Sequence, residues 1–243
     1  MREELLAAVH TVLRRWHAGK QDDLPWGEML SVAQRLAQSP APDPDLAVKE
    51  VVLEALNALE QQGAGQEAQV LRLRFLDGYT AAATANRLNL TEDVVYKRQR
   101  AALSSLACTL WQAELEARSI KKQRIAERLE IKDPPRLFGL DDKLAHLTTV
   151  LASEAPPWLV AVVGIGGIGK TSLADAGVRV LADGLSFVDV GWVSAQQERF
   201  VLWEGLQEAP EGTAALTTEA LVDALIEQFG FRDLSRLPLA FRK

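Results

Sequence analysis

The sequence predicts an all-α N-terminal helical domain with a helix-turn-helix, followed by a partial α/β domain built on a parallel sheet. Three observations lead to this fold class. Apolar residues recur at helical spacing through residues 1–130. Within residues 71–107, short helical segments are separated by turn residues. Further along, an apolar run with β-branched residues at 159–163 leads into a glycine-rich turn and another helical segment.

Three helices are expected in the first part of the chain. The first follows from a single apolar stripe formed by Leu5, Val9, Val12 and Trp16. The second begins at Pro25 and turns its apolar side chains inward, namely Trp26, Met29, Leu30, Ala33 and Leu36. It stops at the Pro/Asp-rich run SPAPDPD, residues 39–45. The third covers Leu46–Gln61 and buries Val51, Val52, Leu56 and Leu59.

The next segment has the layout of a helix-turn-helix, and its sequence is LRLRFLDGYTAAATANRLNLTEDVVYKRQRAALSSLA, residues 71–107. One helix is expected to end at Asp77, and a second is capped by Thr80. After a turn centred on Asn89, a third helix is capped by Thr91 and carries two acids in its first turn, where the helix dipole favours them. The third helix is placed to enter a DNA major groove.

The motifs LRLRFLDG, NRL.L and T..VVYKRQRAAL resemble the C-terminal helix-turn-helix region of bacterial sigma factors and related regulators. Among the departures from that pattern, Thr84 stands where such helices usually bury Ile or Val, and Asn89 replaces the usual turn glycine. Asn tolerates the left-handed conformation that Gly would adopt, so the turn is expected to form. The resemblance implies that the third helix contacts DNA.

The expected DNA contacts are Tyr96, Lys97, Arg98, Gln99 and Arg100. Arg and Lys suit guanine edges and phosphates, and Gln can pair with adenine. Helical spacing lets the basic side chains point outward while Val94, Ala102 and Leu106 pack inward. Residues 71–128 hold 11 Lys and Arg against 6 Asp and Glu, which makes this stretch a candidate nucleic-acid surface. Two alternatives stay open: a solvated helical surface, or a helix-turn-helix that docks a protein or oligomerises.

A long polar helix is expected next, over residues 108–130, and it connects the two halves of the chain. The double proline after it marks a boundary near residue 134, because a proline disfavours helical geometry at the residue before it. The predicted organisation is therefore an all-helical domain over residues 1–107, a linker helix over 108–134, and a second, incomplete domain over 135–243.

Two phosphate-binding patterns overlap in the stretch LVAVVGIGGIGKTSLADA, residues 159–176. Its glycines fit the dinucleotide pattern GxGxxG, but the P-loop pattern GxxxxGK[ST] also accounts for Lys170 and Thr171. In a P-loop the lysine binds the β- and γ-phosphates, the hydroxyl binds Mg²⁺, and loop N–H groups bind phosphate oxygens. The second domain is therefore expected to be a P-loop NTPase domain. The predicted ligands of ATP or ADP are Gly164, Gly166, Gly167, Ile168, Gly169, Lys170, Thr171 and Ser172, with Thr171 also on Mg²⁺.

The second half also resembles a known family, through FGLDDKLAHLTTVL, LVAVVGIGGIGKTSLA and LSFVDVGWVSAQQ in this order. The order is similar to the start of the NB-ARC type of STAND ATPases, which are nucleotide-regulated signalling switches. The resemblance implies that Phe138 and Gly139 lie against the adenine, and that the protein oligomerises when activated as part of a longer chain. No apolar strand ending in two acids follows before Lys243. ATP hydrolysis by this chain alone is therefore not expected.

Composition narrows the class of protein. With 48% hydrophobic and 25% charged residues, the chain has the composition of a globular protein. The single cysteine, Cys108, excludes an internal disulfide framework and a cysteine-rich metal site. The charged start, MREELLAAVHTVLRRW, does not have the pattern of a secretory signal, and the longest apolar run is too short to span a bilayer. A cytoplasmic protein without a membrane partner is expected.

These observations favour a nucleotide-regulated STAND signalling ATPase fragment that regulates transcription through its helix-turn-helix. One alternative is an immune- or defence-type STAND protein whose helical module recruits a protein partner and does not bind DNA. Another is a plain DNA-binding regulator whose P-loop only stabilises the fold. Salt-dependent DNA binding separates the first hypothesis from the second, because phosphate contacts release counterions.

Overall fold

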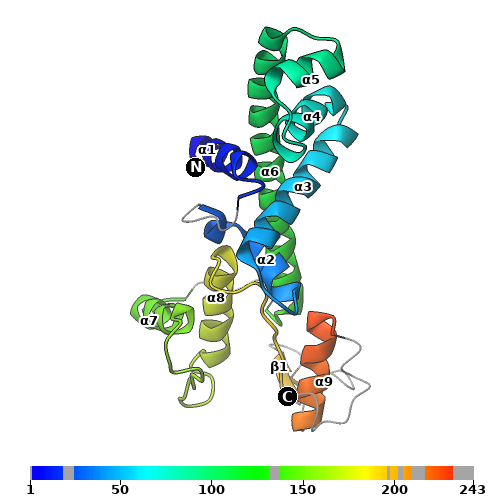
Figure 1. Ribbon diagram of the computed structural model, residues 1–243. Coiled ribbons are helices and arrows are strands. Elements are labelled where there is room, and N and C mark those ends of the chain that lie inside the picture. The colour runs from blue at the N-terminus through cyan, green and yellow to red at the C-terminus, as the bar shows by residue number, and fades with distance from the viewer. Residues whose placement is uncertain are drawn as a thin grey trace. The chain divides into compact units, whose positions relative to one another are not determined.

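The computed structural model describes residues 2–18, 25–131, 137–195, 198–201, 205–208 and 217–231 (Figure 1). The chain divides into two compact units, Met1–Ile120 and Lys121–Lys243. The boundary falls within the longest helix, α6 (Glu92–Arg128), so this one helix contributes residues to both units. None of the helices in the described ranges combines the length and the apolar character of a membrane span.

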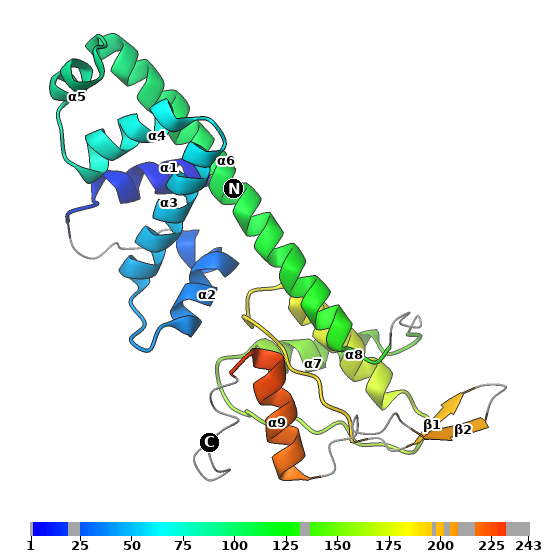
Figure 2. The same cartoon turned by 90° about the vertical axis from the view of Figure 1, so that its right-hand side faces the viewer.

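The first unit is built from helices alone in its described part. In chain order they are α1 (Arg2–Arg14), the 3-10 turn η1 (Pro25–Glu28), α2 (Leu30–Gln38), α3 (Pro44–Gln61), α4 (Gly65–Leu71), the π-helical turn η2 (Arg72–Leu76), α5 (Ala81–Leu88) and the first part of α6. Figure 2 shows α1 crossing close to α3 and α4 beside α6. Three of the four residues of the stripe predicted for the first helix, Leu5, Val9 and Val12, are buried, as expected.

One continuous core holds these helices together. Fully buried leucines meet there from four helices, and they are Leu13, Leu56, Leu71, Leu106 and Leu110. Helix α3 contributes most of its length, since Val51, Val52, Leu56 and Leu59 are all buried. Its start is fixed by Asp43, whose carboxylate accepts from the N–H groups of Asp45 and Leu46. The Pro/Asp run therefore ends one helix and begins the next.

Helix α2 starts in an unusual way. Its N-cap residue, Met29, has no side chain that can accept a hydrogen bond. The fully buried carboxylate of Glu114 on α6 takes that role: Oε1 accepts from the Leu30 N–H at 2.8 Å, and Oε2 accepts from the Ser31 N–H at 3.1 Å. Arg118, one turn further along α6, donates to Glu114 Oε1 at 2.6 Å and to the Glu28 carbonyl at 2.7 Å. The buried Glu114 carboxylate, paired with the half-buried Arg118, thus caps α2 from a distant part of the chain.

The second unit contains the end of α6, α7 (Asp141–Ala152), α8 (Lys170–Asp183), β1 (Glu198–Val201), β2 (Gly205–Glu208) and α9 (Thr218–Phe229). The two strands form an antiparallel pair, with Glu198 opposite Glu208 (Figure 2). A small core joins α6 to α8 through Ile125, Leu129 and Ala182.

Arg128, the last residue of α6, makes the densest set of polar contacts in the described part of this unit. Its guanidinium binds both carboxylate oxygens of Asp189, at 2.7 and 3.1 Å. It also donates to the carbonyls of Val190 and Gln228, and it lies over the Phe229 ring at 5.6 Å from the ring centroid. The planar fork of Arg suits such a multiple contact. The end of α6 is thereby fixed to the segment around residue 190 and to α9.

The predicted fold class, with a parallel-sheet P-loop domain in the second half, is wrong. The described residues contain no parallel sheet, and their only strand pair is the antiparallel β1–β2. Residues 159–163, expected as a strand of that sheet, are not paired as a strand. Leu159 and Val163 are 86% and 87% exposed. An apolar, β-branched run favours extended backbone, but a strand also needs a neighbour for its N–H and C=O groups, and no described segment provides one.

Candidate functional site

The helix-turn-helix forms from local signals. Its first helix, α4 with η2, ends at Asp77. The Thr80 hydroxyl accepts from the Ala83 N–H at 3.1 Å and so begins α5. Asn89 ends α5 in the left-handed conformation, with φ 53° and ψ 49°, as predicted from its tolerance of that region. Helix α6 then begins at Glu92.

A small core beneath the turn fixes the angle between α5 and α6. It consists of Val70, Ala85 and Val95, with Leu88 and Leu90 packed against them. The inward valine of α6 is therefore Val95, and the prediction of Val94 was wrong by one residue of helical phase. Ala102 and Leu106 are fully buried, as predicted.

Thr84 also lies in this region and is fully buried. Its hydroxyl oxygen has no hydrogen-bond partner among the described residues. The departure from the family pattern noted at this position therefore leaves an unsatisfied polar atom in the core.

Three of the five predicted DNA contacts point outward from α6. Lys97 and Arg100 are exposed, and Tyr96 is 44% exposed. Lys97 and Arg100 share one face of the helix with Asp93 and Ser104, which are also exposed, because these positions are three or four residues apart. This face, Asp93, Lys97, Arg100 and Ser104, is called the outer face of α6 below.

The other two predicted contacts are held within the unit. Gln99 accepts from Arg74 Nε at 3.1 Å through its amide oxygen. Arg98 donates to the side chain of Gln66 at 2.8 Å. Both side chains are half-buried. They connect α6 to η2 and α4, and so they brace the outer face of α6.

Sequence reasoning missed a cluster around Tyr79. Arg74 donates to the Tyr79 carbonyl as well as to Gln99, and Arg87 donates to the Tyr79 hydroxyl at 3.1 Å. The Arg87 guanidinium also lies 5.2 Å from the centre of the Tyr79 ring. The basic residues that flank the turn were visible in the sequence, but their shared partner was not.

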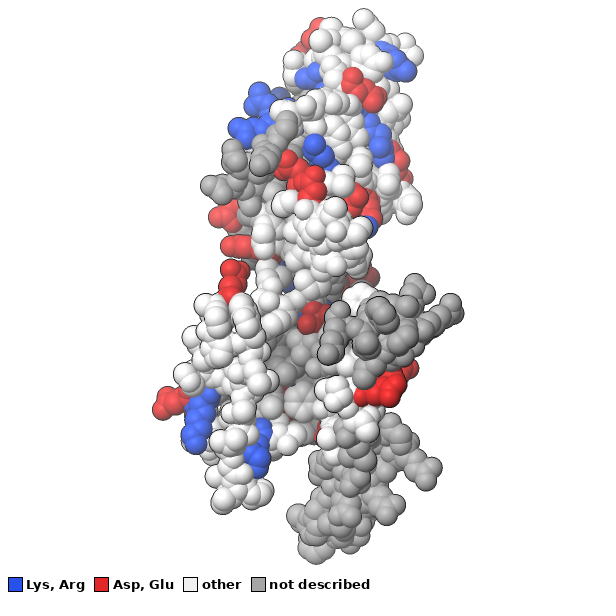
Figure 3. Space-filling model, turned by 60° about the horizontal axis from the view of Figure 1, so that its bottom comes forward, with Lys and Arg blue, Asp and Glu red and all other residues white. Residues whose placement is uncertain are grey.

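Charge is mixed on one face of the molecule. On the face drawn in Figure 3, Lys and Arg side chains are interspersed with Asp and Glu side chains and form no broad basic area. A DNA interface therefore has to be argued from individual residues. The exposed cations of the helix-turn-helix include Lys97 and Arg100 on the outer face of α6 and Arg87 on α5.

The glycine-rich loop lies at the start of α8. Gly167 and Gly169 have φ values of 76° and 92°, which favour glycine, and Gly169 is the N-cap of α8. Lys170 opens the helix, and its ammonium donates to the carbonyls of Gly164 at 3.1 Å and Ile165 at 2.9 Å. The hydroxyl-bearing neighbours, Thr171 and Ser172, are exposed and half-buried.

The remaining predicted nucleotide ligands are spread along the chain. Gly166 and Ile168 are exposed within the loop. Phe138 and Gly139 lie just before α7; Phe138 is 79% exposed, and Gly139 has a φ of 66°.

A pocket of about 370 Å³ adjoins the loop. Its lining residues are Glu130, Val162, Lys170, Thr171, Ala174, Trp192, Val193, Ser194 and Ala195. Its volume and its mixture of apolar walls with a few polar groups are typical of small-molecule sites.

Metal ligands of the protein itself are few here. In the ranges that the structure describes, no group of three or more His, Cys, Asp or Glu side chains is placed to hold a metal ion. Thr171, the predicted Mg²⁺ ligand, is exposed at the second position of α8.

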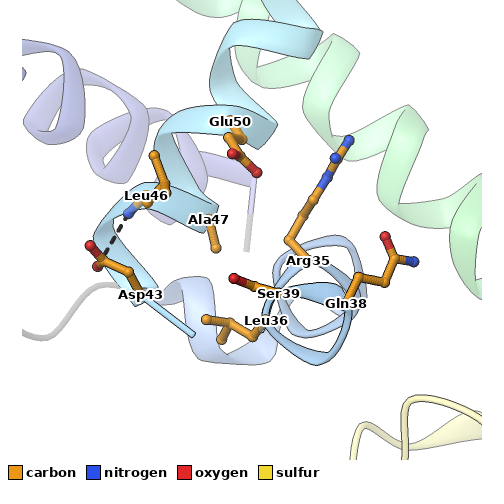
Figure 4. A pocket seen from close by; sticks show the side chains of 8 residues that line it. All are labelled: Arg35, Leu36, Gln38, Ser39, Asp43, Leu46, Ala47 and Glu50. Atoms are coloured by element: carbon orange, nitrogen blue, oxygen red, sulfur yellow. Dashed lines mark hydrogen bonds between the residues drawn. The ribbon is translucent and has the colours of Figure 1, made fainter. Parts of the chain in front are cut away.

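A second pocket, of about 290 Å³, opens between α2 and α3 in the first unit. Figure 4 shows Leu36, Leu46 and Ala47 among its walls, with Arg35, Asp43 and Glu50 around them. Two of these charged groups already have partners: Asp43 caps α3, and Arg35 pairs with Glu54.

Comparison with known proteins supports one of the two candidate sites. Residues 64–107 match the family of Sigma-70, region 4, and this segment covers α4, η2, α5 and the start of α6. No curated protein and no solved structure matches the chain. The NB-ARC resemblance of the second half is not matched by a family of P-loop ATPases. The segment 64–107 is therefore similar to a sigma-factor helix-turn-helix, which indicates a role in DNA binding and transcription regulation.

Proposed function

We propose that the chain binds double-stranded DNA through α5 and α6 and so regulates transcription. The observation that carries this proposal is the coincidence of the matched segment, residues 64–107, with exposed cations on the outer face of α6. In a helix-turn-helix, the second helix of the motif lies in the major groove. Here that helix is α6, and its Lys97 and Arg100 meet the DNA.

The contacts within the unit support different roles for the other predicted residues. Because the amide oxygen of Gln99 accepts from Arg74, Gln99 positions α6 and is not offered to an adenine edge. Arg98, bonded to Gln66, braces the same helix. Lys97 and Arg100 remain to donate to guanine edges or phosphates, with Tyr96 beside them.

The test is a double charge reversal, Lys97→Glu with Arg100→Glu, in the full chain. Each phosphate contact contributes about 0.9 to the slope of log K against log salt, so losing two contacts lowers the slope by about 1.8. The matched control is Arg14→Glu with Arg15→Glu, which changes the net charge equally at two exposed arginines of the first unit. Fluorescence anisotropy on a random duplex pool should show the loss only for the α6 pair.

Two results would contradict DNA binding. If both double variants weaken binding equally, only net charge matters and α6 has no special role. If the folded wild-type chain shows no salt-sensitive binding at low ionic strength, the helix-turn-helix docks a protein effector instead, which is the alternative function.

We further propose that the glycine-rich loop binds the phosphates of ATP or ADP together with Mg²⁺. The conformation of Gly167 and Gly169, the position of Lys170 at the start of α8 and the adjoining pocket support this proposal. The Lys170 ammonium would exchange its bonds to the Gly164 and Ile165 carbonyls for bonds to phosphate, and Thr171 would bind Mg²⁺. The resemblance to STAND signalling proteins suggests that nucleotide state regulates the first unit, with oligomerisation in a longer protein.

Calorimetry with ATP tests the loop. A hydrogen bond to a charged group is worth about 1.5–3 kcal/mol, so Lys170→Ala should weaken ATP binding at least about tenfold. Lys143→Ala, on α7 outside the residues that line the pocket, is the control. Equal affinity of wild type and Lys170→Ala would end the proposal.

A further inference from the structure

The pocket beside the glycine-rich loop contains a carboxylate as well as a lysine. Lys170 is the cation in its lining and Glu130 is the acid. The rest of the wall is apolar or hydroxyl-bearing, including Trp192, Val162 and Ser194. A carboxylate repels phosphate but accepts hydrogen bonds from hydroxyl groups. The two charges therefore fit the two chemically different ends of one ligand.

Glu130 is positioned by the structure around it. It follows the end of α6, where Ile125 and Leu129 are buried against Ala182 of α8. Its Oε1 accepts from the indole N–H of Trp192 at 3.4 Å, a long hydrogen bond. A carboxylate has about four lone-pair sites, so most of its accepting capacity is available to a ligand.

Trp192 is held more firmly still. Its backbone N–H donates to the side-chain oxygen of Gln228 at 2.9 Å, and its carbonyl accepts from the side-chain nitrogen of Gln228 at 2.7 Å. Its side chain packs against the core of α6 and α8. The aromatic wall and the carboxylate thus lie on braced elements, which is the preorganisation that a binding site needs.

We propose that Glu130 binds the ribose hydroxyls of a ribonucleoside phosphate whose phosphates lie at Lys170 and Thr171, with Trp192 as the wall beside the nucleoside. This inference rests on the proposed nucleotide binding and adds the substrate class: a ribonucleotide in preference to a dideoxynucleotide or a bare polyphosphate. It also adds two contact residues, Glu130 and Trp192, that lie outside the glycine-rich loop.

The experiment compares three probes by calorimetry on the full chain: ATP, 2′,3′-dideoxy-ATP and inorganic tripolyphosphate. The wild type should bind ATP roughly tenfold more tightly than dideoxy-ATP, because hydrogen bonds to a charged acceptor are lost. Glu130→Gln should lose most of this preference for ATP over dideoxy-ATP. Glu127→Gln, an exposed position three residues earlier on α6, should keep it.

Several outcomes would overturn the inference, and they are distinguishable. Equal binding of ATP and dideoxy-ATP to the wild type, with Lys170→Ala weakening both, removes the role of Glu130 and leaves the phosphate loop in place. If tripolyphosphate binds as tightly as ATP, the nucleoside contributes nothing to binding, which likewise removes the role of Glu130 and leaves the phosphate loop in place. No binding of any probe to the wild type removes the nucleotide function itself. The wild-type probe comparison does not depend on the folding of a variant, so the result is decisive even if Glu130→Gln is unstable.

Discussion

The substitution Glu114→Gln removes the charge that caps α2. The carboxylate is fully buried and accepts four hydrogen bonds, from the Leu30 and Ser31 N–H groups, the Ser31 hydroxyl and Arg118. A glutamine of the same shape keeps one accepting oxygen and turns an NH₂ group toward donors. Half of the bonds are lost, and Arg118 loses its counter-charge.

The magnitude follows from these contacts. Hydrogen bonds to a charged group contribute about 1.5–3 kcal/mol each, and about two of the four are lost. We therefore expect Glu114→Gln to lower the free energy of unfolding of the first unit by about 3–5 kcal/mol. Glu116→Gln, exposed two residues further along α6, should change it by less than about 0.5 kcal/mol.

The effect should also depend on pH. Burial raises the pKa of Glu114, but the hydrogen bonds from Leu30, Arg118 and Ser31 outweigh it, so the pKa lies below the ordinary value of 4.5. A carboxyl group whose pKa is lowered by folding stabilises the folded state fully when the pH is above the pKa of the group in the unfolded chain. This contribution is lost as the pH falls through the pKa of the group in the folded state. The difference in the free energy of unfolding between wild type and Glu114→Gln should be constant from about pH 6 to 8 and should shrink below pH 4.5.

Urea unfolding followed by circular dichroism measures this difference, and amide exchange at Leu30 and Ser31 localises it to α2. If Glu114→Gln is as stable as Glu116→Gln, or if the difference persists unchanged into acid, the capping role assigned to this carboxylate is refuted.

Three further predictions concern the turn and the loop. Thr84→Val should raise the stability of the first unit by about 1 kcal/mol in thermal melts, because it removes a buried hydroxyl without a partner among the described residues. Thr80→Val should instead lower the stability by about 0.5–2 kcal/mol, because it removes the cap of α5. A destabilised Thr84→Val would show that the Thr84 hydroxyl is satisfied. Asn89→Ala should cost about 1–2 kcal/mol and Asn89→Gly much less, because the position is left-handed; equal melting of the two would count against that conformation. The chain should release no phosphate from ATP beyond the level of Lys170→Ala, and steady turnover that this substitution abolishes would contradict the expectation.

The helix-turn-helix could be predicted because its signals are local. The cap at Thr80, the left-handed turn at Asn89 and the apolar spacing each depend on a few neighbouring residues. The phase error between Val94 and Val95 arose because both are apolar, and only packing against Val70 and Ala85 distinguishes them.

The parallel sheet could not be judged in the same way. The run at 159–163 indicates extended backbone, but pairing depends on residues far away in the chain, and the structure leaves the run exposed. The cap of α2 was invisible for the same reason, since Leu30 and Glu114 are 84 residues apart. In the candidate DNA site, exposure of Lys97 and Arg100 followed from helical spacing, whereas the bonds of Gln99 and Arg98 depended on tertiary neighbours.

The borrowed cap of α2 has a consequence for synthesis of the protein. While the ribosome is still making the first hundred residues, the first N–H groups of α2 have only water to bond with, although the residues of α2 itself are complete. Helices this short are marginal in isolation, so α2 should stay in exchange with coil until residue 114 has emerged and α6 has packed. A nascent chain stalled before Glu114 should therefore be open to proteases within residues 30–38, and one stalled well beyond Arg118 should be resistant there.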